Sequence, residues 1–566
     1  MSLTSTSHLS ARISLIIMTM ILSVLSLSRP ESAQAQWPSV QVISARAVEE
    51  VGGGLSSQSG SSTRSTPRPV QVIVISELMG YIEPCGCTID LTLGAIERLS
   101  AEVKRLKAQG PTLLITAGTQ LFEHHELKKH SRAQEVAKAR LIREIFSKLG
   151  VDAHLPGPRD LIAGLDFYRE LQSSAPLPEV TLNHTQLSPA GRARIFERGG
   201  VKIGVFGLIE PQGHAEAHSE AHKAPSSYSL DQLKSLTQRS IQDLKGLGAQ
   251  VIIGLGVTSR ATLRALATAH PQVDLWVLSE GAQEEAALSP VAHADAQSPA
   301  SYLIEAGDRG RNLALITLSE ASAKGGFKDP VGDHARALKK LELKLKMKER
   351  FAARMPMMRR QVEQIRTEIQ RHRETAPSQE GKRVTYRLIP INDQLPVDEP
   401  VAARVKAYQA SLQELNQAAR ELKPPPKNGN GYAGQAECEL CHPDAVSFWR
   451  ETRHSHAWET LVKAKKTFDV ECVSCHVTGW QEPGGSALGH TDKLKDVQCE
   501  ACHGPAAKHA EIGGGEVYVK LKVPAAKCEG CHNHKHSPKF NYQSYREKIL
   551  GPGHGKPMPA PLEDAQ

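Results

Sequence analysis

Aromatic side chains are scarce in this sequence, at 4% of 566 residues. A nucleic-acid-binding protein usually combines a basic face with interleaved aromatic residues. The net charge of +8 is modest for this length, and most of the excess falls within residues 333–374. Together these features argue against a nucleic acid as a partner.

Long apolar runs are also lacking, apart from one near the N-terminus. The run "ISLIIMTMILSVLSLS" follows His8 and Arg12 and precedes the small-residue pattern "AQA" at residues 33–35. It is too short and too rich in serine for a comfortable membrane span. We therefore predict a signal peptide over residues 1–35, with an uncleaved anchor as the alternative. The mature chain is expected in the periplasm, without a transmembrane segment.

The chain is longer than one hydrophobic core normally holds, so several domains are expected. The predicted fold class is multidomain, with a layered α/β sandwich, a helical connector and a mainly α-helical C-terminal domain. The predicted segments are a disordered linker (36–69), the α/β domain (70–320), the connector (330–425), the C-terminal domain (431–556) and a disordered tail (557–566).

Only ten cysteines are present, and eight of them fall in the pentapeptides "CELCH", "CVSCH", "CEACH" and "CEGCH". In this spacing, two cysteines form thioether bonds to a haem and the following histidine binds its iron. A zinc ribbon would leave four identically spaced histidines without a role. We predict four covalent c-type haems, attached through Cys438, Cys441, His442, Cys472, Cys475, His476, Cys499, Cys502, His503, Cys528, Cys531 and His532.

The segments "FWRETRHSHAWETL", "CVSCHVTGW", "VQCEACHGPAAKHA" and "CHNHKHSPKFNYQSYREKI" resemble the tetrahaem cytochromes c of the c-554 type over residues 432–555. The resemblance implies distal iron ligation by His454 and His509, with His554 as a third candidate. It also implies haems within electron-tunnelling distance of one another, and it allows one haem to lack a distal ligand. Further histidines of the region are His456, His490, His534 and His536.

Apolar runs alternate with amphipathic stretches between residues 70 and 319, which predicts strands and helices in regular βαβ order. This order resembles the metallophosphoesterases, in particular periplasmic 5′-nucleotidases. At the places where that family holds two metals, this chain has Ser76-Glu77, Gly118-Thr119, residues 157–160, residues 255–257 and residues 279–281. We expect the fold to remain and the hydrolytic site to be lost. Asp160 and His154 remain, and Glu77, His124 and His125 form a possible substitute.

The remaining two cysteines, Cys85 and Cys87, flank Gly86 directly after the first predicted strand. The motif resembles a subgroup of exported nucleotidase-like proteins in which Cys-Gly-Cys replaces the first metal ligands. Such a pair can close a strained disulfide, which raises its reduction potential, or bind a soft metal such as Cu(I) or Zn(II). A purely structural disulfide is the alternative.

The predicted connector contains apolar stripes at helical spacing, one of Leu338, Leu341 and Leu345 and another of Val362, Ile365 and Ile369, with Pro356 between them. We predict a helical hairpin that separates the two domains. A basic surface for an acidic partner or an anionic membrane is a further possibility.

These features predict an exported multihaem cytochrome that transfers electrons between redox partner proteins, quinone-linked or other cytochromes, and a nucleotidase-like domain with a Cys-Gly-Cys site. One alternative is a nucleotide hydrolase with an accessory cytochrome domain. Another is a reductase acting at an open haem. The sequence favours electron transfer over hydrolysis without deciding whether the protein is an enzyme.

Overall fold

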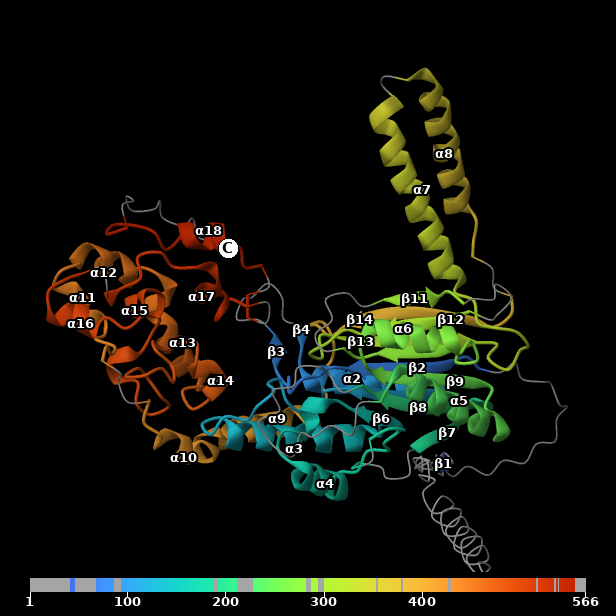
Figure 1. Cartoon of the computed structure of the whole chain (residues 1–566), viewed down its shortest axis with the longest axis horizontal. Helices are drawn as coiled ribbons and strands as arrows, with labels where there is room; N and C mark the ends of the chain where they lie inside the picture. Colours follow the sequence, from blue (N-terminus) through green and yellow to red (C-terminus); the bar gives the residue numbers. More distant parts are fainter. Residues whose placement is uncertain are drawn as a thin grey trace, which may run out of the picture.

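The structure is a computed structural model of the whole chain (Figure 1). The predicted signal peptide and C-terminal tail lie outside the described residues, as does most of the predicted linker. The described residues are 41–45, 68–85, 93–184, 186–187, 192–210, 228–280, 287–293, 300–352, 355–377, 380–425, 429–515, 518–533, 536–537 and 539–554.

Two β-sheets form the body of the N-terminal part. One has the strand order β14-β13-β2-β5-β6, and the other has the order β1-β7-β8-β9-β10-β12-β11. The strands are β1 Gln41–Ala45, β2 Val70–Ser76, β5 Thr112–Gly118, β6 Ala153–Pro156, β7 Arg192–Arg198, β8 Val201–Ile209, β9 Val251–Val257, β10 Leu275–Leu278, β11 Leu288–Val291, β12 Ser301–Glu305, β13 Asn312–Ser319 and β14 Arg383–Pro390. Two short strands, β3 Pro84–Cys85 and β4 Leu93–Gly94, pair separately.

The two sheets share one apolar core, in which Val74 and Ile115 of the first sheet meet Val205 and Ile253 of the second. The helices α2, α3 and α9 cover the outer face of the first sheet, and α5 and α6 cover the second. This arrangement of helix, sheet, sheet and helix confirms the predicted layered α/β sandwich. The helices of the body are α2 Ile96–Lys107, α3 Arg132–Leu149, α4 Leu165–Ser174, α5 Leu230–Gly246, α6 Arg260–Ala269 and α9 Glu399–Leu415, with a 3₁₀ turn at Pro158–Leu161.

The local sequence explains these elements. The run "VQVIVIS" is almost wholly buried as β2, as expected for a strand covered on both faces. Helix α3 ends at Gly150, whose φ of 66° is left-handed and favours glycine. Helix α2 ends at Lys107, with Ala108 as its C-cap.

The predicted hairpin exists, but it does not separate the two domains. Its helices, α7 Pro330–Ala352 and α8 Pro356–Glu374, are inserted between β13 and β14, and they stand away from the body in Figure 1. Strand β14 then returns to pair antiparallel with β13 along its whole length. The first sheet therefore includes residues beyond the expected boundary at residue 320. Only α9 and the short α10 Gln417–Arg420 lead to the C-terminal part.

Short helices and turns make up the C-terminal part, and its described residues contain no strand longer than an isolated bridge. Its small apolar core includes Leu461, Val473 and Leu488. The helices are α11 Gln435–Glu439, α12 Pro443–Arg450, α13 Ala457–Ala464, α14 Val470–Val473, α15 Cys499–His503, α16 Ala507–Glu511, α17 Ala525–Glu529 and α18 Tyr542–Glu547, with 3₁₀ turns at Arg453–His456 and Asp492–Leu494. Across the described part of the chain, no helix has the length and hydropathy required for a bilayer span.

Candidate functional site

Each of the four Cys-x-x-Cys-His motifs includes a short helix in this structure: α11, α14, α15 or α17. None of the eight cysteines of the motifs, all of which are described, forms a disulfide. Cys438 interacts with Cys499 through their sulfur atoms, and Cys475 interacts with Cys531 in the same way. The first motif therefore lies beside the third, and the second lies beside the fourth. This clustering would place bound porphyrins close to one another.

Three histidines expected as distal ligands each lie opposite a motif histidine. The ring centroids are 6.3 Å apart for His442 and His509, 6.1 Å for His503 and His554, and 6.1 Å for His532 and His454. Two imidazoles that bind one metal at about 2.0 Å through nitrogen have their ring centres roughly 6 Å apart. The spacing therefore fits one iron between the rings of each pair.

Hydrogen bonds orient several of these rings. Nδ1 of His503 lies 2.7 Å from the Lys520 carbonyl oxygen, and Nδ1 of His509 lies 3.1 Å from the Gly515 carbonyl oxygen. A ring that donates through Nδ1 keeps Nε2 as the lone-pair nitrogen, which is the usual state of a metal-binding histidine. Burial lowers the pKa of His454, and the same effect lowers the pKa of His554. A lowered pKa keeps these imidazoles neutral and able to bind a metal.

The second motif differs from the other three. Nδ1 of His476 lies 2.5 Å from the Ala457 carbonyl oxygen, so this ring is also oriented. Among the described residues, no second histidine ring is placed against His476. His456 is instead exposed, with Nδ1 3.6 Å from Oε2 of Glu459. His534 lies outside the described residues.

The segment that leads into the second motif contacts the N-terminal body. Gln134 of α3 donates from Nε2 to Oδ1 of Asp469 at 2.6 Å, just before α14. Its Oε1 accepts from Nδ2 of Asn416 at 2.7 Å and from the backbone N–H of Val470 at 3.1 Å. Gln134, Asn416 and Asp469 are all buried. One glutamine side chain therefore joins the body, the connecting helices and the second motif.

Two ion pairs reinforce this interface. Lys138 of α3 pairs with Glu471, and Lys466 pairs with Glu83, which also accepts a hydrogen bond from Gln409. Glu83 directly precedes β3, which ends at Cys85. In Figure 1, β3 and β4 lie on the side of the body that faces the C-terminal part. The backbone of Cys85 is described but its side chain is not, and Cys87 lies outside the described residues.

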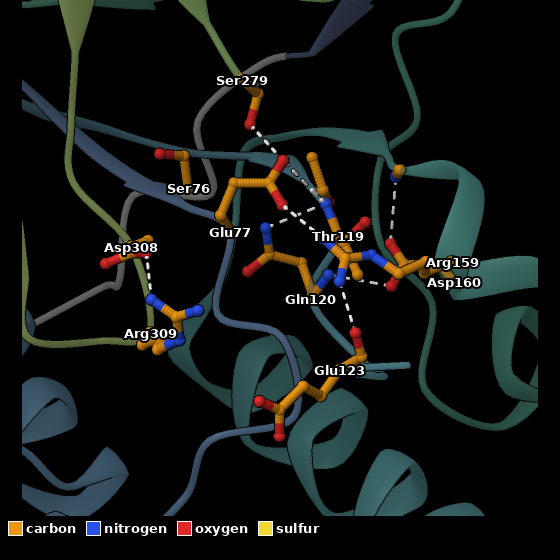
Figure 2. Close-up of polar contacts among 12 residues, drawn as sticks. Ser76, Glu77, Thr119, Gln120, Glu123, Arg159, Asp160, Ser279, Asp308 and Arg309 are labelled. Carbon is orange, nitrogen blue, oxygen red and sulfur yellow. Dashed lines mark hydrogen bonds and ion pairs between the residues drawn. The ribbon is translucent and has the colours of Figure 1, made fainter. Parts of the chain in front are cut away.

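The ends of β2, β5 and β10 meet at a separate polar cluster (Figure 2). Ser279 donates to Oε1 of Glu77 at 2.9 Å, and the backbone N–H of Thr119 donates to the same oxygen at 3.3 Å. Gly118 permits this approach, because a Cβ there would lie 2.0 Å from that oxygen. The strand ends expected from the sequence therefore do converge.

Glu77 is buried, has a left-handed φ of 48° and leaves Oε2 without a hydrogen-bond partner in the described residues. Burial raises the pKa of Glu77 to about 7. Asp160 is also buried, and burial raises its pKa to about 6. This shift remains although its carboxylate oxygens accept hydrogen bonds from the backbone N–H groups of Gln120, Leu121 and Gly157. A strained, partly unpartnered acid at strand ends is the kind of feature that marks a functional site.

These residues do not fit a two-metal centre. Both carboxylate oxygens of Asp160 already accept hydrogen bonds from backbone N–H groups, and Glu77 lies beside the cationic Arg159, with Nη2 3.8 Å from Oε2. His124 and His125 are exposed, whereas Glu77 is buried, so the substitute cluster considered from the sequence is not assembled. Within the described ranges, no three His, Cys, Asp or Glu side chains are arranged to hold a metal.

Glu77 should make stability depend on pH. The folded chain keeps the Glu77 proton up to a pKa of about 7, whereas the unfolded chain loses it near the ordinary pKa of 4.5. Between these values the folded state binds more protons, so the free energy of unfolding falls as pH rises. We expect a loss of up to about 3 kcal/mol from this group between pH 5 and pH 8. E77Q should flatten this slope in denaturant titrations, whereas E170Q, at an exposed site, should not; equal slopes would contradict the assignment.

The two parts of the chain are similar to different groups of known proteins. Residues 437–504 match the family model described as cytochrome c554 and c-prime. The C-terminal part resembles cytochrome c-554. The alignment with that protein from Nitrosomonas europaea is 141 residues long with 29% identity, and it covers 19% of this chain and 60% of the relative. The chain therefore spans less than two thirds of the length of that relative.

The N-terminal part resembles solved phosphoesterase structures. A 5′-nucleotidase precursor from Thermus thermophilus has 13% identity and a TM-score of 0.42, with 64% of this chain and 61% of that chain covered. The calcineurin-like phosphoesterase YfkN from Bacillus subtilis has 14% identity and a TM-score of 0.40, with 62% and 99% covered. The sulfate thiohydrolase SoxB from Thermus thermophilus has 13% identity and a TM-score of 0.42, with 68% of this chain and 69% of that chain covered.

Proposed function

We propose that this protein is an exported multihaem c-type cytochrome that transfers electrons to or from its own nucleotidase-like domain. The observation that carries the proposal is the pairing of three motif histidines with three other histidines at 6.1–6.3 Å. Four haems would be attached through the four motifs. The similarity to cytochrome c-554 supports this proposal for the C-terminal part.

The chain's own residues determine how each haem would be held. The motif cysteines would anchor it, and His442, His503 and His532 would bind the iron from one side. His509, His554 and His454, in the same order, would bind from the other side. Bound haem of this kind supplies reversible one-electron chemistry. His476 would bind alone, so the second motif would retain an open iron position.

The second motif is the proposed point of exchange between the two parts. It is fixed to α3 through Gln134, and Lys466 beside it is paired with Glu83, two residues before Cys85. We propose that Cys85 and Cys87 form the redox or soft-metal site that communicates with this motif. As a disulfide, the pair would take up two electrons and two protons to become two thiols.

The proposal includes the periplasm as location and other redox proteins, quinone-linked or cytochromes, as external partners. Support comes from the predicted signal peptide and from the chemistry of c-type haem, which is attached outside the bacterial cytoplasm. Nucleotide hydrolysis is not favoured, because the strand-end residues do not fit a two-metal centre.

Replacing a distal histidine tests the proposal. H509A should convert one six-coordinate haem into a five-coordinate one, because Ala cannot bind the iron opposite His442. The ferric spectrum should gain high-spin bands, while the iron content per chain stays unchanged. H490A, at an exposed histidine of the same region, is the matched control and should leave the spectrum unaltered. An unchanged spectrum in H509A, or no iron in the mature unaltered chain, would overturn the assignment.

A further inference from the structure

The hairpin of α7 and α8 is not used in the proposed electron transfer. It is built on an internal seam in which Leu341 of α7 packs against Ile365 and Ile369 of α8. Ion pairs on its sides, Arg366 with Glu349 at 2.9 Å and Arg373 with Glu342 at 2.9 Å, join the two helices. At about 1.5 Å per residue, α7 alone extends about 35 Å. The hairpin is thus a self-supporting arm that leaves the body at one edge of the first sheet (Figure 1).

The far half of this arm exposes large apolar side chains. Leu343, Met347 and Phe351 follow one another at four-residue spacing, on the side of α7 away from the seam, and are 60%, 59% and 56% exposed. Met355 and Met357, at the start of α8, are 50% and 71% exposed. We call these five residues the apolar tip. Contiguous exposed apolar side chains of this size usually mark a surface that another molecule covers.

The apolar tip is surrounded by positive charge. Residues 344–360 contain seven Lys or Arg and a single acidic residue, Glu349, which is already paired with Arg366. Lys344, Lys346 and Arg350 are exposed on α7 beside the tip. Next to the tip, Glu342 is likewise paired, with Arg373 of α8. The charge that a partner would meet around the tip is therefore mostly positive.

We propose that the apolar tip docks onto an anionic phospholipid bilayer, inserting its Phe and Met side chains among the lipids while the basic residues contact the headgroups. An anionic bilayer combines the two properties that this surface complements, a negatively charged exterior and an apolar layer beneath it. A second copy of the chain would bring two basic tips together, and like charges in contact oppose association. The arm thereby holds the protein at a membrane surface without crossing it.

The test uses the haem-loaded full chain and vesicles. The unaltered chain should co-sediment with vesicles of phosphatidylglycerol and phosphatidylcholine far more than with vesicles of phosphatidylcholine alone, and added salt should weaken binding. M347S/F351S/M357S should weaken binding at least about tenfold, because the variant lacks three apolar side chains whose transfer from water into the bilayer stabilises the bound state. K344Q/K346Q/R350Q should remove the preference for the anionic vesicles.

A matched control separates the tip from general surface hydrophobicity. V462S/I512S/L521S changes three apolar residues of similar exposure in the C-terminal part and should bind as the unaltered chain does. All of these side chains are exposed, so circular dichroism spectra should agree among the variants. Equal vesicle binding by the tip variant and the control would overturn the proposal. The proposal would also be overturned if the unaltered chain did not bind anionic vesicles but self-associated or bound acidic proteins through the tip.

Discussion

A chain carrying C472S and C475S should contain one haem fewer than the unaltered chain and should no longer pass electrons between its two parts. Its iron content should fall by about a quarter, since one of four attachment motifs is removed. The larger effect concerns Cys85 and Cys87. The second motif is the one held against the N-terminal body through Gln134, so its loss should interrupt exchange with that pair.

The measurement is thiol labelling. After chemical reduction of the haems, excess reductant is removed and the thiols of Cys85 and Cys87 are alkylated and quantified by mass spectrometry. C438S/C441S is the matched control, because it removes a haem from the first motif, which lies beside the third rather than at the interface. Cys85 and Cys87 should be labelled in the reduced control. In the C472S/C475S chain, their labelling should be no higher than in a sample to which no reductant was added. Equal labelling in the two variants would remove the second motif from the proposed path.

Reversing the charge of Lys138 should disrupt the contact between the two parts. Lys138 is buried and pairs with Glu471, close to Asp469. Burial already raises the pKa of Asp469, and the carboxylate of Glu471 raises it further. K138E would add a third carboxylate to this site. Because Glu471 is partly exposed, we expect a loss of about 2 kcal/mol in the free energy of unfolding, below the range for fully buried pairs.

The control for this prediction is R140E, two residues along the same helix. Arg140 pairs with Glu170, and both side chains are about half exposed, so reversing this charge should cost much less than reversing that of Lys138. Denaturant unfolding gives the energies. Limited proteolysis of the chain around residues 420–430 reports whether the two parts separate. If K138E unfolds and is cleaved like R140E, the ion pair does not hold the interface.

The elements with the strongest local signals could be predicted from the sequence. Continuous apolar runs indicated the buried strands β2, β5 and β9, and Gly150 ended α3 as its backbone required. The spacing of the Cys-x-x-Cys-His motifs identified the candidate haem-binding region before any geometry was known. In each case the signal lies within a few neighbouring residues.

Features that depend on distant residues were missed. Strand β14 was included in the helical connector because its sequence, "RVTYRLIP", is half exposed at the edge of the sheet and lacks an apolar run. Gln134 gave no signal, since a glutamine within an amphipathic helix looks like any solvated residue. Its role arises only when Asn416 and Asp469 are brought to it. For the same reason, the sequence did not indicate which distal histidine pairs with which motif histidine, because the two residues of each pair are distant in the chain.

The late return of β14 also determines where the polypeptide can be divided. In a fragment that stops near residue 320, the eight residues of β13 would lack their antiparallel neighbour β14. The unpaired backbone groups of that edge strand could then pair with other chains, which promotes aggregation. It would also lack α9, whose Val405 helps to cover the first sheet. As the chain is synthesised from its N-terminus, the sandwich cannot close until the residues up to the end of α9 at Leu415 are present, so the cysteine-rich remainder follows soon after its completion.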